Sequence, residues 1–181
     1  MIRGFLYIFY ILTAGMVLSS CVTNPPLDRQ GCENADWYEL GRRDGAQGLP
    51  VNVYESRRQD CGLKSEIARE NLYLNGRNAG LVDFCTSDNG FEMGRTGQIY
   101  YYVCPVDEEV EFLSRYRVGR KVYQLEKANQ EISSELETLL ARLRSAQISA
   151  QQKGALGKQV ENLKSARVQN DKALQELKRS L

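Results

Sequence analysis

A chain of 181 residues, with 26% charged residues and a formal net charge of +1, has the size of one domain, or of a small domain with an appendage. The near-neutral charge argues against nucleic acid as a partner, because nucleic-acid-binding proteins carry an excess of Lys and Arg. The sequence contains no histidine, which excludes the side chain used most often in general acid-base catalysis.

The segment 1–20 has the composition of a signal peptide. Arg3 supplies a positive charge, and residues 5–17 form an apolar stretch that is too short to span a bilayer comfortably. Residues 18–21, Leu-Ser-Ser-Cys, resemble the bacterial lipobox, which implies cleavage before the cysteine and its acylation, with palmitate as a typical chain. We therefore expect lipid attachment at Cys21. The alternatives are a secreted protein cleaved elsewhere and an uncleaved anchor helix.

Residues 21–31 include Pro25 and Pro26 and little that a core could bury, so we expect an extended tether of roughly 30 Å. Each buried methylene of an acyl chain contributes about 0.8 kcal/mol, so two or three chains hold a protein on a membrane persistently. In well-studied Gram-negative bacteria an aspartate after the lipidated cysteine retains a lipoprotein in the inner membrane. This chain has Val22 there, which resembles an address in the inner leaflet of the outer membrane, facing the periplasm.

Four further cysteines, Cys32, Cys61, Cys85 and Cys104, follow the lipobox. An even number in an exported chain predicts two disulfides. A zinc site is the rival interpretation, but the sequence offers neither a Cys-x-x-Cys pair nor a histidine, and we expect no metal or other cofactor. Three pairings are possible. We favour sequence neighbours, Cys32 with Cys61 and Cys85 with Cys104, each bridge stabilising the fold by about 3 kcal/mol.

The pattern aromatic-x-x-Gly-Arg occurs four times, beginning at Tyr38, Tyr73, Phe91 and Tyr116. In the first two copies another glycine follows four residues after the first. On a helix the ring and the glycines share one face, where a second backbone can come close. The four copies are spaced too unevenly for a solenoid, which would keep a fixed period. The pattern therefore predicts one compact domain that reuses a packing device.

Two interpretations of this repeat are open. In the first, which we favour, the repeats pack helices together and their arginines pair with carboxylates such as Asp44, Asp83 and Glu92. In the second, the repeats line a groove for a sugar or peptide of the cell wall, since arginine binds carboxylates bidentately. The residues of that groove would be Tyr38, Arg42, Tyr73, Arg77, Arg95, Tyr116 and Arg120.

Three further segments accompany the repeats and the lipobox: Gly-Leu-Val-Asp-Phe-Cys at 80–85, Gly-Phe-Glu-Met-Gly-Arg at 90–95 and Tyr-Val-Cys-Pro at 102–105. Together they resemble a family of small Gram-negative envelope lipoproteins known only as a domain of unknown function. The resemblance covers about residues 32–123. It implies an envelope location and a fold, and it brings no known activity, substrate or catalytic residue.

Local signals predict the elements of this region. Asn34 or Asp36 can cap a helix that ends near Gly45, and a second helix is expected over residues 64–80. Residues 99–103 are the one strand-like run. Pro105 and the acidic residues after it open a further helix, because carboxylates suit the first turns of a helix.

This last helix is predicted to be long. Seam residues, mostly apolar, recur in steps of four and three over residues 118–150 and again over 156–181. Gly154 and Gly157 would cost about 2 kcal/mol inside a continuous helix, so we favour a turn near 153–157 and an antiparallel hairpin. The rival is a continuous helix that pairs in parallel with a second copy, with Asn129 and Asn170 setting the register.

The expected fold is mainly α with at most a short strand pair. It comprises a disulfide-stapled repeat domain over residues 32–106 and a long helical region over 107–181. Residues 21–112 carry nine basic and sixteen acidic side chains, whereas residues 113–181 carry fourteen and seven. The basic half is either an ordinary solvated surface, which we favour, or it contacts the acidic half or an anionic surface such as lipopolysaccharide, phospholipid or cell-wall carboxylates.

The sequence has no Gly-x-Ser-x-Gly motif, phosphate loop or nucleophile with a visible base, so we do not expect an enzyme. Paired carboxylates that hydrolyse a glycan are the remaining catalytic alternative. The leading interpretation is an envelope lipoprotein, monomeric or a parallel homo-oligomer, that has a structural role or contacts another envelope protein through its coiled coil. The second is a periplasmic binding module or inhibitor that recognises a cell-wall ligand.

Overall fold

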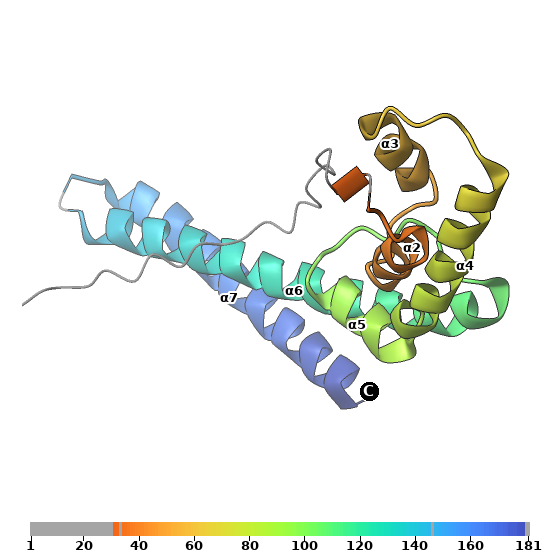
Figure 1. Cartoon of the computed structure of the whole chain (residues 1–181). Coiled ribbons are helices and arrows are strands. Elements are labelled where there is room, and N and C mark those ends of the chain that lie inside the picture. The colour runs from red at the N-terminus through yellow and green to blue at the C-terminus, as the bar shows by residue number, and fades with distance from the viewer. Residues whose placement is uncertain (1–30, 33, 146, 180–181) are drawn as a thin grey trace, which may run out of the picture.

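The computed structural model describes residues 31–32, 34–145 and 147–179. Its helices are α2 (Trp37–Ala46), α3 (Val53–Asp60), α4 (Ile67–Phe84), α5 (Ser87–Arg95), α6 (Val106–Arg144) and α7 (Ala150–Arg179). Figure 1 shows that α2 to α5 lie together at one end of the molecule, where α5 packs on the first part of α6, while the rest of α6 pairs with α7 in a hairpin that extends away from them. The prediction of a mainly α fold is confirmed. The expected signal peptide, Cys21 and residues 22–30 of the tether lie outside the described residues.

The ends of the short helices follow from local sequence. Asp36 caps α2, because its carboxylate accepts a hydrogen bond of 3.1 Å from the Glu39 N–H. Glycines in the left-handed region follow α2 and α5, with φ of 65° at Gly48 and 77° at Gly97. Beyond each of these glycines the next N–H donates to the carbonyl five residues earlier, which is the Schellman ending of a helix.

The first two repeats pack α2 against α4 backbone to backbone. A Cβ at Gly41 would overlap the carbonyl oxygen of Tyr73, and a Cβ at Gly76 would overlap the carbonyl oxygen of Tyr38. The contact is reciprocal, since each aromatic residue places its carbonyl over the glycine of the other repeat. Helix α4 continues four residues past the predicted end at Gly80, because Gly80 is part of this helix crossing.

The third and fourth repeats make the same reciprocal contact between α5 and α6. A Cβ at Gly94 would overlap the carbonyl oxygen of Tyr116, and a Cβ at Gly119 would overlap that of Phe91. The four repeats therefore pair in chain order, first with second and third with fourth. This is the packing device expected from their sequence.

The domain has two apolar cores, and the second joins the two helix pairs, because the Phe84 ring of α4 stacks on the Phe112 ring of α6. The first contains Trp37, Leu40, Tyr54 and Tyr73, and the second contains Leu81, Phe84, Cys85, Met93, Tyr100, Cys104 and Phe112.

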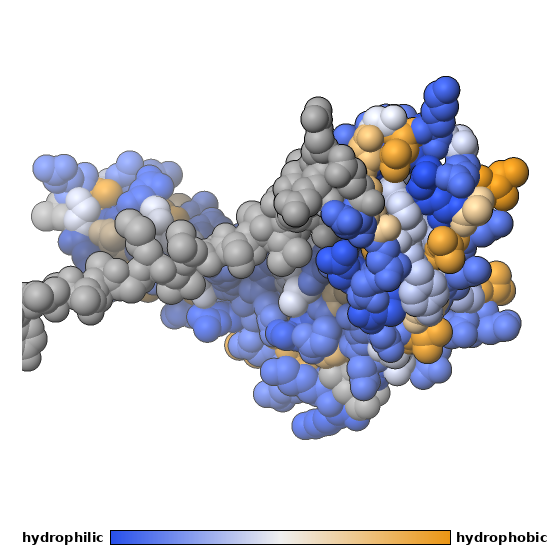
Figure 2. All heavy atoms as spheres, viewed as in Figure 1, coloured by the Kyte–Doolittle hydropathy of each residue, from blue (hydrophilic) through white to orange (hydrophobic). Residues whose placement is uncertain are grey.

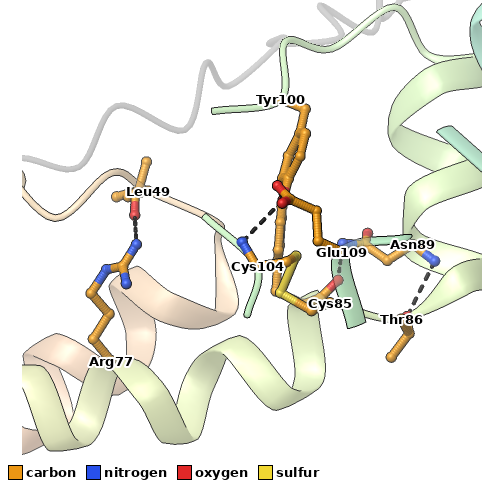
Figure 3. The surroundings of a disulfide bond; sticks show 9 residues. Leu49, Arg77, Cys85, Thr86, Asn89, Tyr100, Cys104 and Glu109 are labelled. Carbon is orange, nitrogen blue, oxygen red and sulfur yellow. Dashed lines mark hydrogen bonds between the residues drawn. A yellow bond between two sulfur atoms is a disulfide. The ribbon is translucent and has the colours of Figure 1, made fainter. Parts of the chain in front are cut away.

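The two disulfides join the expected sequence neighbours. The bridge between Cys32 and Cys61 connects the chain before α2 with the end of α3. The bridge between Cys85 and Cys104 connects the end of α4 with the residue before Pro105, the N-cap of α6 (Figure 3).

The hairpin turns earlier than predicted. The chain reverses between Arg144 and Ala150, whereas Gly154 and Gly157 lie inside α7 in open space. The reason is a capping box: the Gln152 N–H donates to the Ser149 hydroxyl at 3.3 Å, and the Ser149 N–H donates to the Gln152 side chain at 2.8 Å. These two bonds start the helix ahead of the glycines.

The two arms of the hairpin are antiparallel within one chain. The Asn170 side chain donates to the Asn129 side chain at 3.0 Å, and the Asn129 amide in turn donates to Asp171 at 2.7 Å. Nearer the turn, Leu139, Leu156 and Val160 are buried between the helices. The two asparagines that would have set the register of a parallel oligomer set the register of the hairpin instead.

Two further expectations need correction. Residues 99–103 form no strand, and none occurs among the described residues; this segment has no partner strand, and Tyr102 has a φ of 55°. The expected domain boundary at residue 107 also divides a continuous helix, because Phe112 is fully buried in the second core and Gly119 lies at the α5/α6 crossing. Helix α6 belongs to both the domain and the hairpin. No described helix is both long enough and apolar enough to cross a membrane.

Candidate functional site

The arginines of the odd-numbered repeats pair within their own helices. Arg42 forms an ion pair of 2.8 Å with Glu39, and Arg95 forms one of 2.9 Å with Glu92. In both cases the glutamate follows the aromatic residue of the repeat, three positions before the arginine. The hydrogen bond from Arg42 lowers the pKa of Glu39. Both pairs are exposed to water, so they contribute little to stability.

The arginines of the even-numbered repeats reach across to the partner helix. Arg77 donates to the Leu49 carbonyl at 2.9 Å, and Arg120 donates to the Gly97 carbonyl at 3.1 Å. Each of these carbonyls lies just after the C-terminus of the partner helix, α2 or α5. Figure 3 shows the bond between Arg77 and Leu49. These arginines therefore fasten the loops that follow the partner helices.

The tyrosines proposed for the groove are also engaged in packing. Tyr73 is fully buried, and the Tyr116 hydroxyl donates to the Gln98 carbonyl at 2.7 Å. Tyr38 remains 41% exposed. The structure therefore does not bring the seven predicted residues to one groove, because most of them bind the protein itself.

A buried polar network was not predicted from the sequence. The Asp44 carboxylate is 1% exposed and accepts two hydrogen bonds from Arg57, at 2.8 and 2.6 Å, and one from the Tyr73 hydroxyl at 2.7 Å. The bond to Asp44 raises the pKa of Arg57, and burial raises the pKa of Tyr73. The network ties α3 to the α2/α4 pair. The sequence did contain an indication of this network. Asp44 lies between Gly41 and Gly45 on the face of α2 that packs against α4, and a carboxylate buried there needs a partner.

A cleft of about 600 Å³ opens at the surface between the two helix pairs, beside the end of α2. An adjoining cleft of about 280 Å³ shares four of its residues and adds Ile99 and Tyr101. The shared surface carries side-chain amides, with apolar side chains beside them. The first cleft is lined by Ala46, Gln47, Leu49, Phe84, Asn89, Glu92, Met93, Thr96 and Gln98. Its one carboxylate, from Glu92, is ion-paired, so the cleft suits an uncharged polar molecule.

The loop beside this cleft exposes apolar side chains on a rigid base. Ile99, Tyr101 and Tyr102 are 68%, 54% and 73% exposed. Between them Tyr100 is buried; its hydroxyl donates to Glu109 and accepts the Cys104 N–H, both at 3.0 Å (Figure 3). Burial raises the pKa of Tyr100 to about 12. The left-handed conformation of Tyr102 costs about 1–2 kcal/mol, so the packing around Tyr100 holds this loop in a strained form.

The chemistry available in the described part of the chain is limited. No group of three or more His, Cys, Asp or Glu side chains is placed there to hold a metal ion. The resolved shifts lower the pKa of Glu39 and Glu55 through hydrogen bonds from arginines and raise the pKa of buried tyrosines. None of these carboxylate and tyrosine shifts moves a pKa toward neutral pH, where a general acid or base works best. Burial lowers the pKa of the Arg77 guanidinium.

Residues 36–121 match a family model whose description is "Protein of unknown function (DUF2799)". This segment is a DUF2799 domain. It begins at the N-cap of α2 and ends two residues after Gly119, so the DUF2799 domain contains all four repeats and both helix crossings. The match agrees with the region expected from the family resemblance. No curated protein and no solved structure matches the chain.

Proposed function

We propose that this protein is a lipid-anchored lipoprotein of the bacterial envelope whose DUF2799 domain presents a rigid helical arm to a partner. The continuity of α6 carries the proposal. This helix of 39 residues contributes Phe112 and Gly119 to the domain and then runs on into the hairpin without a break. From Tyr123, whose ring lies against Gly97 in the loop after α5, to Arg144 the helix extends by about 30 Å.

The lipobox and the disulfides support the envelope part of the proposal. Two disulfides suit an oxidising compartment such as the periplasm. Lipid attachment at Cys21, without the inner-membrane retention signal, favours the periplasmic face of the outer membrane. The intramolecular hairpin favours a monomer. The proposed role is that of a structural protein or an adaptor, with no catalytic step.

The anchor is tested by fatty-acid labelling. Labelling is expected in the wild-type protein and absent from Cys21→Ala, and undiminished labelling of the variant would exclude the anchor.

The arm is tested by crosslinking in cells. A photoreactive residue at the exposed Glu131 or Glu135 on α6 should give a specific adduct with an envelope protein, whereas one at Glu55 on α3 should not. Adducts from Glu55 alone would move the interaction site to the domain.

The cleft between the helix pairs favours a second candidate function, a binding module for an uncharged cell-wall saccharide. Its amide side chains and the neighbouring Tyr101 are groups that hydrogen-bond and stack with sugars. Cosedimentation with cell-wall sacculi that is lost in Gln98→Ala but retained when the arm is altered would favour this second role.

A further inference from the structure

The free end of the hairpin carries cations in a stretch of the sequence that has no acidic residue. Residues 138–160 contain four basic residues and no Asp or Glu, whereas the rest of residues 113–181 contains ten basic and seven acidic residues. The four are Arg142, Arg144, Lys153 and Lys158, here called the tip cations. All four are exposed, and none takes part in the ion pairs of the described residues. Most of the charge excess of this half is therefore unpaired and concentrated at one end.

Helix stability accounts for only part of this arrangement. Arg142 and Arg144 lie in the last turn of α6, where the helix dipole favours cations. Lys153, however, lies at the start of α7, whose first turn has no acidic residue. The dipole favours a negative charge there. The positive charge at the start of α7 is therefore not explained by the helix dipole.

Among the described residues, the same end exposes no large apolar side chain, because Leu156 is buried and Ile148 partly buried in the hairpin core. The exposed large apolar side chains of the described chain lie on the domain and the start of α6, with Val168 as the one on the hairpin. Hydrophilic side chains predominate at the free end on the face shown in Figure 2. Stable protein interfaces centre on buried aromatic or apolar residues, whereas a polybasic surface suffices for anionic lipid.

We infer that the tip cations bind the phosphate-bearing surface of an anionic phospholipid membrane by electrostatic attraction, without insertion. A cleft of about 230 Å³ beside Arg142 is lined by Gln152 and Gln159, which add uncharged donors next to the cations, and by the apolar side chains of Ile148, Ala155 and Leu156. The inference rests on the proposed role of the hairpin as a presenting arm. It gives the protein two contacts with lipid, one through Cys21 and one at the far end of α6.

Vesicle binding tests the inference. The chain from residue 21 with Cys21→Ser, which has no acyl group, is mixed with vesicles of phosphatidylcholine that contain or lack phosphatidylglycerol. Binding is expected with phosphatidylglycerol only, and it should weaken at high salt because the Debye length falls to about 3 Å at 1 M. Replacement of the four tip cations by glutamine should weaken binding on the order of 1,000-fold, since each cation near an anionic surface contributes about 1 kcal/mol and about 1.4 kcal/mol is tenfold in affinity.

A matched variant distinguishes the effect of the tip cations from the effect of net charge on vesicle binding. Glutamine at the exposed Lys127, Arg167, Lys172 and Lys178 removes the same charge from the same hairpin and should weaken binding far less. Equal losses in the two variants, equal binding to neutral vesicles, or pelleting with sacculi in place of vesicles would overturn the inference. A crosslink from the tip to an acidic protein, with no vesicle binding, would also overturn it. Because the tested chain has no anchor, failed vesicle binding leaves the fatty-acid labelling result intact, and failed labelling leaves vesicle binding intact.

Discussion

Gly119 of α6 lies directly against Gly94 of α5, and a Cβ on Gly119 would come within 3.0 Å of the Gly94 Cα. Between α2 and α4, the glycines of the first two repeats meet the partner backbone in the same way. The shared geometry of the two crossings explains why glycine stands at the fourth position of every repeat. A larger residue there would push two backbones apart and open both neighbouring cores.

Replacement of these glycines should therefore depend on their place in the fold. Gly119→Ala is expected to destabilise the protein by more than about 2 kcal/mol, because backbone atoms of Phe91 and Arg95 leave no room for a methyl group. Gly154→Ala, in open space on α7, should instead stabilise by about 0.5–1 kcal/mol. Urea unfolding measures both. A neutral Gly119→Ala would refute the close crossing.

The buried carboxylate of Asp44 should be more important than any surface charge. Asp44→Ala leaves Arg57 buried without its carboxylate, which typically costs about 3–5 kcal/mol. Glu39→Gln breaks the exposed pair with Arg42 and should change stability little. Thermal unfolding of the two variants checks the contrast, and similar melting temperatures for the two would contradict the buried network.

The raised pKa of Tyr100 predicts that the protein loses stability in alkali. Its pKa is 10.0 when unperturbed and about 12 in the folded protein, so the unfolded state loses the proton first. The stabilisation is complete below about pH 10 and falls as the pH rises toward 12. Tyr100→Phe should be less stable at neutral pH by about 1–3 kcal/mol, because the buried Cys104 N–H loses its acceptor.

The pH dependence of the free energy of unfolding above about pH 10 distinguishes the loss of the Tyr100 hydroxyl from a general destabilisation. In Tyr100→Phe the free energy of unfolding should depend less steeply on pH between about 10 and 12, while Tyr73, whose pKa burial also raises, retains part of the dependence. Tyr102→Phe removes the hydroxyl of an exposed ring and serves as the control. An unchanged slope in Tyr100→Phe would contradict the assignment.

The disulfides predict that Cys32, Cys61, Cys85 and Cys104 resist alkylation until a reductant is added. Paired replacement of Cys85 and Cys104 by alanine should destabilise by about 3 kcal/mol. Non-reducing peptide mapping should recover the two bridges as peptides joined between sequence neighbours. Quantitative alkylation of the unreduced protein would contradict both bridges.

Features set by neighbouring residues could be predicted from the sequence. The cap at Asp36, the opening of α6 at Pro105 and the close packing of the repeats each depend on residues a few positions apart or on one helix face. Helix α3 was missed because it carries few apolar residues, with only Tyr54 and Arg57 buried. Its place is fixed by contacts with distant segments.

The partners of the repeat arginines could not be predicted for the same reason. Packing was the favoured interpretation of the repeats and the groove the alternative, yet Arg77 and Arg120 find backbone acceptors 28 and 23 residues away, which sequence spacing cannot reveal. The turn of the hairpin was predicted too late in the chain, because the prediction relied on Gly154 and Gly157 and not on the capping pattern before them. The pattern Ser-x-x-Gln at 149–152 predicts the start of α7 and could have been read from the sequence.

The distance between spin labels at Lys127 and Lys172 tests most directly whether α7 folds back on α6 to form the arm. Both positions are exposed, and the pairing of Asn129 with Asn170 puts them opposite each other. With labelled chains diluted in unlabelled protein, we predict a single narrow distance of about 10–20 Å, since packed helices lie about 8–10 Å apart. A distance of roughly 70 Å, as a continuous helix with a rise of about 1.5 Å per residue requires, or a signal that disappears on dilution, would contradict the arm.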